Sequence, residues 1–255
     1  MEPAVLRDDM VASLEHEMKG LVRSDNVGLA LRTVPRHEFV PIDAEQGAYA
    51  DKSFDHRGTR ILAPSIVARL LEALDVREDD SVLVVGAGAG YTSAVLAEIV
   101  GECNVHAIDI TRTIVYEARE NLETAGYGGV FVDCGDGADG LPEYAPFDRI
   151  LVEAAAIEPP RTLVSQLADD GRLVIPLGSG IQRLTAVEPS DSDSGTPETV
   201  GEFGKTAFAP LLVEGEQSDT LERNRTNRED REFAERHAQT RRGWEHEWID
   251  WDGYS

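Results

Sequence analysis

The sequence predicts an α/β fold in which a doubly wound, mostly parallel sheet ends in an antiparallel edge. Three observations predict it. Short runs rich in β-branched residues alternate with helical patterns, a glycine-rich turn follows one of these runs, and two further strand-like runs close the pattern. Such alternation requires parallel strands joined by right-handed crossovers. The 255 residues suffice for one domain of this kind with appendages.

Helices are expected before the sheet. Val11, Leu14, Met18 and Leu21 recur at helical spacing, which predicts an amphipathic helix over residues 8–22. A second, shorter helix is expected around residues 26–32.

An irregular loop is expected next. About thirty residues are punctuated by Pro35, Pro41, Gly58 and Pro64. Loops of that length inside a compact domain are usually functional.

The sheet itself is predicted from the alternation that follows. Strands are expected at 81–85, 104–108, 130–133, 148–152 and 171–176, with helices at 91–100, 112–125 and 160–168. Residues 181–187 and 199–209 are expected to form the antiparallel pair, joined by the solvated acidic loop EPSDSDSGTPE. Together these elements predict a domain over residues 1–215, with helices and loop in 1–75 and the ligand-binding sheet in 76–215.

Residues 216–255 form a charged tail that contains Trp244, Trp248 and Trp251. Residues 228–242 could form a charged helix. On a helix, Trp244 and Trp248 would share one face, which could dock on the domain or on another subunit.

The charge balance is strongly acidic. Asp and Glu number 48 against 24 Lys and Arg, giving a net charge of −24, and the lysines are three: Lys19, Lys52 and Lys205. Molar salt shortens the Debye length to about 3 Å and screens such self-repulsion. The composition therefore predicts a halophilic protein, with an ordinary acidic protein as the alternative. Nucleic acid is not expected as a partner, because phosphate binding needs concentrated basic side chains.

A cytoplasmic location is expected. The longest apolar runs fall far short of the roughly 20 residues of a membrane helix, and the N-terminus lacks the pattern of a signal peptide. Cys103 and Cys134 are too few for a zinc site and are far apart in sequence, so we expect reduced core cysteines and no metal.

The segment VLVVGAGAGYTSAVLAEIV carries the main chemical signal, a strand that leads through Gly86, Gly88 and Gly90 into a helix. Glycines permit a tight turn and close approach to a ligand at the carboxyl edge of the sheet. A dinucleotide fold prefers Gly-x-Gly-x-x-Gly, but Tyr91 occupies the third position here. Asp109 ends the next expected strand, where its carboxylate could accept hydrogen bonds from both ribose hydroxyls. The alternative is a plain strand-to-helix turn.

The segment CGDGADG places Asp136 and Gly137 after the third strand, at the same edge. An acidic side chain and a backbone amide there could contact an adenine. Taken alone, the segment could equally be a turn. Combined with the two preceding loops, it predicts a nucleoside pocket.

Over residues 11–212 the sequence resembles the protein-L-isoaspartate O-methyltransferases. The resemblance rests on VPRHEFVP (34–41), AYAD (48–51), ILAP (61–64), VGAGAGYTSAVLA, GDG, APFDRILVEAAA (145–156) and QLADDGRLVIPLG (166–178). It implies a Rossmann-like methyltransferase fold that uses S-adenosyl-L-methionine to methylate the carboxylate of isoaspartyl residues in damaged proteins. It also implies cofactor contacts at the glycine loop, Asp109, Asp136 and Gly137.

Two departures from the family pattern concern the reaction. The family usually has serine at the position of Leu62, against the reacting groups, and histidine at the position of Ser65. Leucine cannot donate a hydrogen bond. Ser65 or a backbone amide could compensate, the substrate could have changed, or the chain could be a non-catalytic cofactor binder.

The loop before the sheet is expected to cover the substrate through Arg36, His37 and Tyr49. Alternatively, Arg36 and His37 pair only with the acidic surface. The expected partner is a damaged protein or peptide, with no membrane contact, and the expected state is a monomer or small homo-oligomer.

Overall fold

The computed structural model describes residues 2–16, 19–190 and 197–212. The helices are α1 (Pro3–Glu15), α2 (Asp25–Thr33), α3 (Pro64–Leu74), α4 (Tyr91–Val100), α5 (Arg112–Ala125) and α6 (Arg161–Val164). The strands are β1 (Phe54–His56), β2 (Thr59–Ile61), β3 (Val82–Val85), β4 (Val105–Asp109), β5 (Phe131–Cys134), β6 (Phe147–Val152), β7 (Leu167–Leu177), β8 (Gln182–Glu188) and β9 (Glu198–Thr206). The short 3-10 helices of the described residues are η1 (Arg36–Phe39), η2 (Ile42–Gly47), η3 (Glu102–Asn104) and η4 (Pro142–Tyr144).

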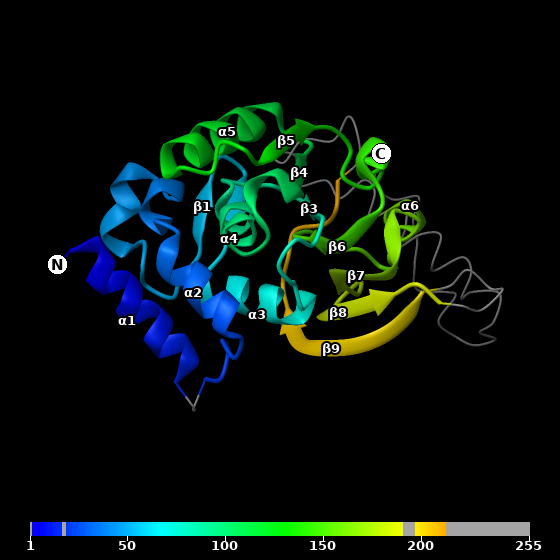
Figure 1. The fold of residues 1–255 in the computed structure, drawn as a ribbon, viewed down its shortest axis with the longest axis horizontal. Helices are drawn as coiled ribbons and strands as arrows, with labels where there is room; N and C mark the ends of the chain where they lie inside the picture. Colours follow the sequence, from blue (N-terminus) through cyan, green and yellow to red (C-terminus); the bar gives the residue numbers. More distant parts are fainter. Residues whose placement is uncertain (1, 17–18, 191–196, 213–255) are drawn as a thin grey trace, which may run out of the picture.

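Among the described residues the main sheet has seven strands in the order β5-β4-β3-β6-β7-β8-β9 (Figure 1). Strands β1 and β2 form a separate hairpin. Strands β3 to β7 pair in parallel, whereas β8 and β9 pair antiparallel. The predicted α/β class with an antiparallel edge is therefore confirmed. The strand order reverses beside β3, between β4 and β6, where open sheets of this kind bind ligands.

Strand β3 shows why the sheet is covered on both faces. Successive side chains of a strand point to opposite faces. Val82 and Val84 join a core cluster that includes helices α1 to α5, and Leu83 and Val85 join a second cluster with Phe147 and other residues. All four β3 side chains are buried, as expected for a central strand of a doubly covered parallel sheet.

The N-terminal helix begins and ends earlier than predicted. It spans Pro3–Glu15, where the periodicity had indicated residues 8–22. Pro3 occupies its first turn, where a missing N–H costs nothing. The chain then folds back, because the backbone N–H groups of Leu21 and Val22 both donate to the Leu14 carbonyl, at 3.0 and 3.4 Å.

The helix α3 was absent from the predicted elements. It begins with Pro64 in its first turn, and Val67, Leu70, Leu71 and Leu74 are all buried. These residues follow the helical spacing i, i+3, i+4, i+7, so the signal was present in the sequence. The expected irregular loop also contains ordered structure, namely η1, η2 and the β1-β2 hairpin.

The predicted helix over residues 160–168 is a single turn, α6, because β7 already begins at Leu167. Leu167 pairs with Phe147 of β6, and the register shifts before Arg149. At Gly171 a Cβ would lie 2.9 Å from backbone atoms of Ala168. Strand β7 therefore starts four residues earlier than its apolar run indicates, and only glycine fits at position 171 without a clash.

The cysteines were expected in the core, and this prediction was wrong. Cys103 and Cys134 are both free and exposed. Cys103 lies in η3 and Cys134 at the end of β5, on the rim of the fold. The tail over 216–255, including its tryptophans, lies outside the described residues.

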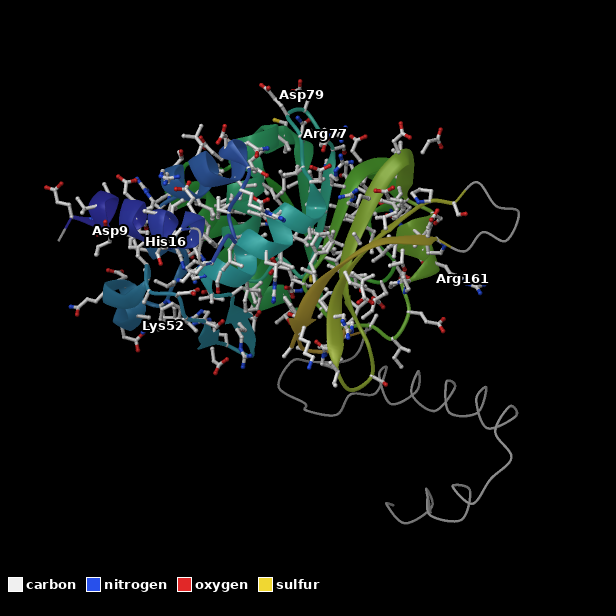
Figure 2. The ribbon with its side chains drawn as sticks, turned by 90° about the horizontal axis from the view of Figure 1, so that it is seen from below. Asp9, His16, Lys52, Arg77, Asp79 and Arg161 are labelled. Carbon is white, nitrogen blue, oxygen red and sulfur yellow. The ribbon has the colours of Figure 1, made fainter. Side chains whose placement is uncertain are left out.

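Charged side chains cover the surface of the described part. Figure 2 shows oxygen-tipped side chains all around the outline, and the labelled basic residues Lys52, Arg77 and Arg161 lie far apart. No helix among the described residues is long and apolar enough to cross a membrane.

Candidate active site

The glycine loop lies at the carboxyl end of β3. Gly86, Gly88 and Gly90 have φ values of +91°, +51° and +93°, a region that side chains rarely tolerate. The Gly86 N–H donates to the Ile108 carbonyl at 2.8 Å, which ties the turn to β4. Gly86 and Gly88 line a cleft of about 550 Å³. Gly90 lies behind them, because a Cβ there would be 3.1 Å from Cγ of Leu122 in α5.

Asp109 stands at the end of β4 and lines the same cleft. Its Oδ2 accepts a hydrogen bond from the Gly88 N–H (3.1 Å), and its Oδ1 accepts one from the Thr111 N–H (2.9 Å). Burial raises the pKa of Asp109, and these backbone hydrogen bonds oppose that rise. A carboxylate offers about four lone-pair sites. Asp109 therefore keeps acceptor capacity for hydroxyl groups of a ligand.

The loop after β5 contributes Gly137 to the cleft. A Cβ on Gly137 would lie 2.5 Å from Cγ1 of Val85, so no side chain fits between this loop and β3. The Asp136 side chain is not among the described residues lining the cleft, and its Oδ1 accepts the Ala138 N–H at 2.8 Å. The structure thus brings Gly137, but not the Asp136 side chain, to the cleft wall.

The β1-β2 hairpin and the residues after it form the wall opposite the glycine loop. Leu62 lies there, and only 8% of it is exposed. Thr59 lies there too, with its Oγ1 3.7 Å from the position of a Cβ on Gly88. Arg60 is the one basic residue among the described residues of the cleft, and its Nε contacts Oδ1 of Asp55 at 2.9 Å. This wall therefore presents the apolar Leu62, the Thr59 hydroxyl and the ion pair between Arg60 and Asp55.

A third wall was missed from the sequence. Residues 207–212 leave β9 and cross the carboxyl edge of the sheet beside β6. The Ala155 N–H donates to the Ala209 carbonyl (2.8 Å), and the Leu211 N–H donates to the Ala155 carbonyl (2.9 Å). Phe208 and Leu211 make this wall apolar. A strand had been predicted through residue 209, but β9 ends at Thr206.

Glu153 is the other residue that sequence reasoning missed. It follows β6 directly and lines the cleft, and its Oε1 is buried without a hydrogen-bond partner among the described residues. Burial raises the pKa of Glu153 to about 7, a hydrogen bond with Thr92 opposes the rise, and the charge of Asp109 adds to it. The signal was available, because an acidic residue ends an apolar strand here as Asp109 does in β4.

Arg36 was expected to cover the substrate or to pair with the acidic surface, and the structure contradicts both. The side chain is fully buried and not among the described residues of the cleft. Its Nε donates to the Ala48 carbonyl (2.8 Å), its Nη2 donates to the Leu62 carbonyl (2.6 Å), and its Cζ lies 4.6 Å from the ring centre of Tyr91. Burial lowers the pKa of Arg36. Arg36 thus fastens the pre-sheet segment and the Leu62 backbone to α4.

Three other predicted residues are not among the described residues that line the cleft. His37 Nδ1 and the Tyr49 hydroxyl are 2.7 Å apart, and His37 Nε2 is 3.4 Å from Oε1 of Glu38. Ser65 lies in the first turn of α3, where its N–H donates to Oδ1 of Asp51 at 3.0 Å. None of the three is among the described residues lining the cleft, so compensation for Leu62 by the Ser65 hydroxyl lacks support.

The cleft fits the predicted cofactor, S-adenosylmethionine. Glycines leave room for close backbone approach, Asp109 offers acceptors for hydroxyls, and Glu153 offers an unpaired acceptor to a cation. The cofactor carries ribose hydroxyls and positive charges. Within the described residues, no group of three or more His, Cys, Asp or Glu side chains is placed to hold a metal ion.

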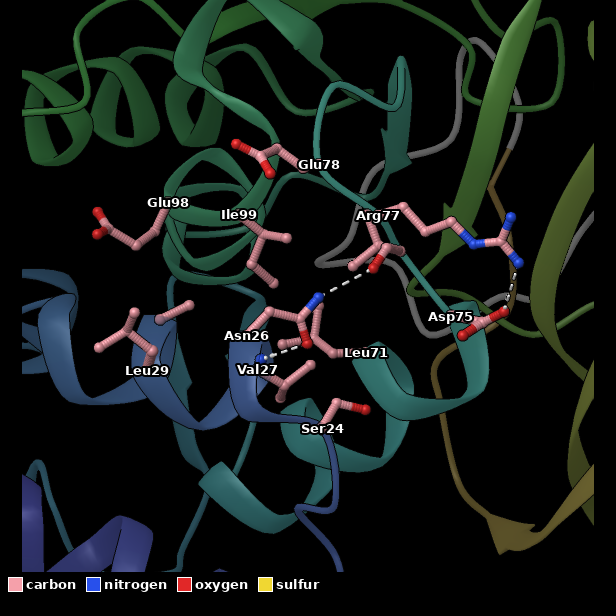
Figure 3. Close-up of a pocket in the computed structure, with 12 residues that line it drawn as sticks. Ser24, Asn26, Val27, Leu29, Leu71, Asp75, Arg77, Glu78, Glu98 and Ile99 are labelled. Atoms are coloured by element: carbon pink, nitrogen blue, oxygen red, sulfur yellow. Dashed lines mark hydrogen bonds and ion pairs between the residues drawn. The ribbon is translucent and has the colours of Figure 1, made fainter.

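A second hollow, of about 490 Å³, lies between α2, α4 and the connection from α3 to β3 (Figure 3). This connection enters β3 from its amino end, so the hollow is at the edge opposite the glycine loop. Asn26 ties α2 to the connection, because its Nδ2 donates to the Val76 carbonyl (3.1 Å), and its Oδ1 accepts the Val27 N–H within α2 (2.8 Å). The second hollow therefore lies where α2, α4 and the connection pack together, and it is not the candidate site.

Comparisons with known proteins agree with this geometry. The sequence profile of the family Protein-L-isoaspartate(D-aspartate) O-methyltransferase (PCMT) matches residues 7–215. A protein-L-isoaspartate O-methyltransferase of Aeropyrum pernix is 48% identical over 173 residues, which cover 66% of this chain and 66% of that protein. One from Methanocella arvoryzae is 43% identical over 182 residues, covering 70% of this chain and 94% of that protein.

Solved structures give the same fold. A Plasmodium falciparum protein described as a β-aspartate methyltransferase, in complex with S-adenosyl-L-homocysteine, superposes with a TM-score of 0.68 at 21% identity, covering 81% of this chain and 98% of that one. A structure of a protein-L-isoaspartate O-methyltransferase gives a TM-score of 0.65 at 28% identity, covering 86% of this chain and 69% of that one.

Proposed function

Because the chain belongs to the protein-L-isoaspartate(D-aspartate) O-methyltransferase family and is an S-adenosylmethionine-dependent methyltransferase, we propose that it methylates the free carboxylate of isoaspartyl residues in damaged proteins. The observation that carries the proposal is one cleft. It joins the glycine loop, Asp109 and Gly137 to Leu62 of the ILAP motif, so the cofactor-binding edge faces the segment that resembles the family's acceptor site.

The residues at the sheet edge would hold the cofactor. The glycine loop would offer close backbone contact, the Asp109 carboxylate would accept hydrogen bonds from ribose hydroxyls, and Gly137 would leave room for the adenine. When bound, the cofactor supplies an electrophilic methyl group on a positively charged sulfur. The chain needs no general base, because a substrate carboxylate is already ionised at neutral pH.

The other walls position the acceptor and exclude water. Arg60 is the basic residue of the described cleft that an incoming carboxylate would meet, and it would do so in competition with Asp55, which already pairs with its Nε. Leu62, Phe208 and Leu211 surround the interior with apolar surface. A water-poor cleft favours the neutralisation of opposite charges. Alignment of the reacting groups alone can supply about 7 to 11 kcal/mol of the barrier reduction.

Thr59 is the residue that we propose as a partial substitute for the serine that Leu62 replaces. Its hydroxyl lies in the cleft wall and faces the glycine loop. Leu62 presents only apolar atoms, so the missing donor must come from a neighbour or from water. Loss of one orienting hydrogen bond costs only about 1 to 3 kcal/mol. The substitution therefore reduces the rate without abolishing the reaction.

Replacing Leu62 by serine is expected to raise the rate of methyl transfer to an isoaspartyl peptide about tenfold, which corresponds to ~1.4 kcal/mol of barrier. The measurement is the initial rate with radiolabelled cofactor in high salt. Leu62→Ala is the matched control, because it removes the same apolar side chain without adding a hydroxyl. The proposal requires Leu62→Ser to exceed both Leu62→Ala and the native protein. If Leu62→Ser is no faster than Leu62→Ala, a hydroxyl at this position does not orient the acceptor.

The departure at Leu62 also supports a second candidate, methyl transfer to another acceptor. In that case the native protein labels an acceptor in crude cell extract and leaves isoaspartyl peptides unmodified. A protein that binds cofactor and labels nothing would be a non-catalytic relative. We further propose that the protein acts in the cytoplasm as a monomer or small homo-oligomer.

A further inference from the structure

Four neighbouring strands each end in a group that faces the cleft. Gly137 follows β5, Asp109 ends β4, Gly86 follows β3 and Glu153 follows β6, which is the order of these strands in the sheet. Neighbouring strands lie about 4.8 Å apart. A cofactor with its adenine at Gly137 and its ribose at Asp109 therefore places its amino-acid end beside Gly86 and Glu153.

Glu153 is held against the glycine loop. Its N–H donates to the Val85 carbonyl at 2.8 Å, and a Cβ on Gly86 would lie 3.5 Å from the Glu153 Cβ. Its buried Oε1 has no hydrogen-bond partner among the described residues. An ionised carboxylate accepts hydrogen bonds and cannot donate them. The free position therefore suits a positively charged donor.

We propose that Glu153 binds the α-ammonium group at the methionine end of the cofactor. A substrate carboxylate is a poor alternative, because a second negative charge beside Glu153 and Asp109 would be repelled. The ammonium supplies both the charge and the N–H donors that Oε1 lacks. The inference rests on the cofactor cleft and not on the identity of the methyl acceptor, so it can fail or hold independently of isoaspartyl methylation.

The pairing couples cofactor binding to a proton. Asp109 on β4 is the charged group that acts on Glu153, and Thr92 on α4 donates a hydrogen bond to it. The other charged residues lining the described cleft are Asp55 and Arg60 of the hairpin, which form an ion pair with each other. The pKa of Glu153 is about 7 without ligand. A bound cation favours the ionised form and lowers this pKa. Below pH 7 Glu153 is mostly protonated, so it must lose its proton when the cofactor binds. The affinity for the cofactor therefore falls as the pH falls.

The test is titration calorimetry of the native protein and Glu153→Gln between pH 6 and 8, at one KCl concentration. The probes are S-adenosylmethionine, S-adenosylhomocysteine and the analogue of S-adenosylhomocysteine that lacks the α-amino group. Glu153→Gln should weaken both amino-bearing ligands about tenfold or more at pH 8, since a hydrogen bond to a charged group is worth roughly 1.5 to 3 kcal/mol. The amine-free analogue should bind both proteins equally.

Proton release gives a second readout on the native protein alone, from binding heats in buffers of different ionisation enthalpy. At pH 6.5 the native protein should release a proton when it binds S-adenosylhomocysteine and none when it binds the amine-free analogue. Glu143→Gln, an exposed change away from the cleft, should behave as native. The proposal is overturned if Glu153→Gln weakens all three ligands equally or none, if it weakens S-adenosylmethionine alone, or if the native protein releases equal protons with both homocysteine ligands.

Discussion

Replacing Asp109 by alanine is expected to weaken S-adenosylmethionine binding at least a hundredfold. The Asp109 carboxylate lies at the end of β4 in the cleft, where it can accept hydrogen bonds from two ribose hydroxyls. Each such charged hydrogen bond contributes about 1.5 to 3 kcal/mol, so two of them account for about a hundredfold or more. Alanine also leaves the N–H groups of Gly88 and Thr111 without their acceptor. Calorimetric titration of the purified variant measures the change.

The control for this change is Asp133→Ala, on the neighbouring strand β5. Asp133 is not among the described residues lining the cleft, and its Oδ1 accepts the N–H of Cys134. Asp133→Ala should leave the affinity for S-adenosylmethionine near the native value, and NAD should bind to neither variant. Binding of Asp109→Ala within threefold of native, or tight NAD binding by the native protein, would refute the assignment of the ribose site.

Arg36→Ala is expected to lower the free energy of unfolding by about 3 to 5 kcal/mol. The change leaves the buried carbonyls of Ala48 and Leu62 without donors, at about 1 to 3 kcal/mol each, and it opens a cavity against Tyr91. Relief of the buried guanidinium charge offsets part of this loss. Urea unfolding at constant KCl provides the measurement.

His37→Ala supplies the comparison, because this neighbouring side chain is only half-buried and should cost about 1 kcal/mol or less. The two changes also separate a structural role from a substrate-binding one. A variant Arg36→Ala with native stability but a raised KM for peptide would restore the substrate-contact interpretation of this arginine.

The residues of the cofactor-binding edge could be predicted from the sequence because each has the same position relative to a strand. Gly86, Gly88, Asp109 and Gly137 each follow or end a parallel strand, and the carboxyl ends of such strands meet at one edge. Glu153 obeys the same rule and was overlooked inside the motif APFDRILVEAAA. The helix α3 was likewise readable from its apolar spacing.

The remaining errors concern contacts that sequence spacing does not specify. Whether an arginine is buried depends on distant partners, and Arg36 finds its partners 12 and 26 residues further along the chain. The wall over residues 207–212 is held by Ala155, more than fifty positions earlier in the chain. Cys103 and Cys134 are small and apolar enough for a core, but both are exposed, one in the short helix η3 and one at the end of β5.

The most direct test of the account is methyl transfer by the native protein to an isoaspartyl peptide and to its aspartyl twin, in high salt with labelled cofactor. The two peptides differ only in how the carboxylate is spaced from the main chain. We expect base-labile methyl ester on the isoaspartyl peptide and none on the twin. If the protein binds the cofactor and yet leaves the isoaspartyl peptide unlabelled, the proposed repair activity is contradicted.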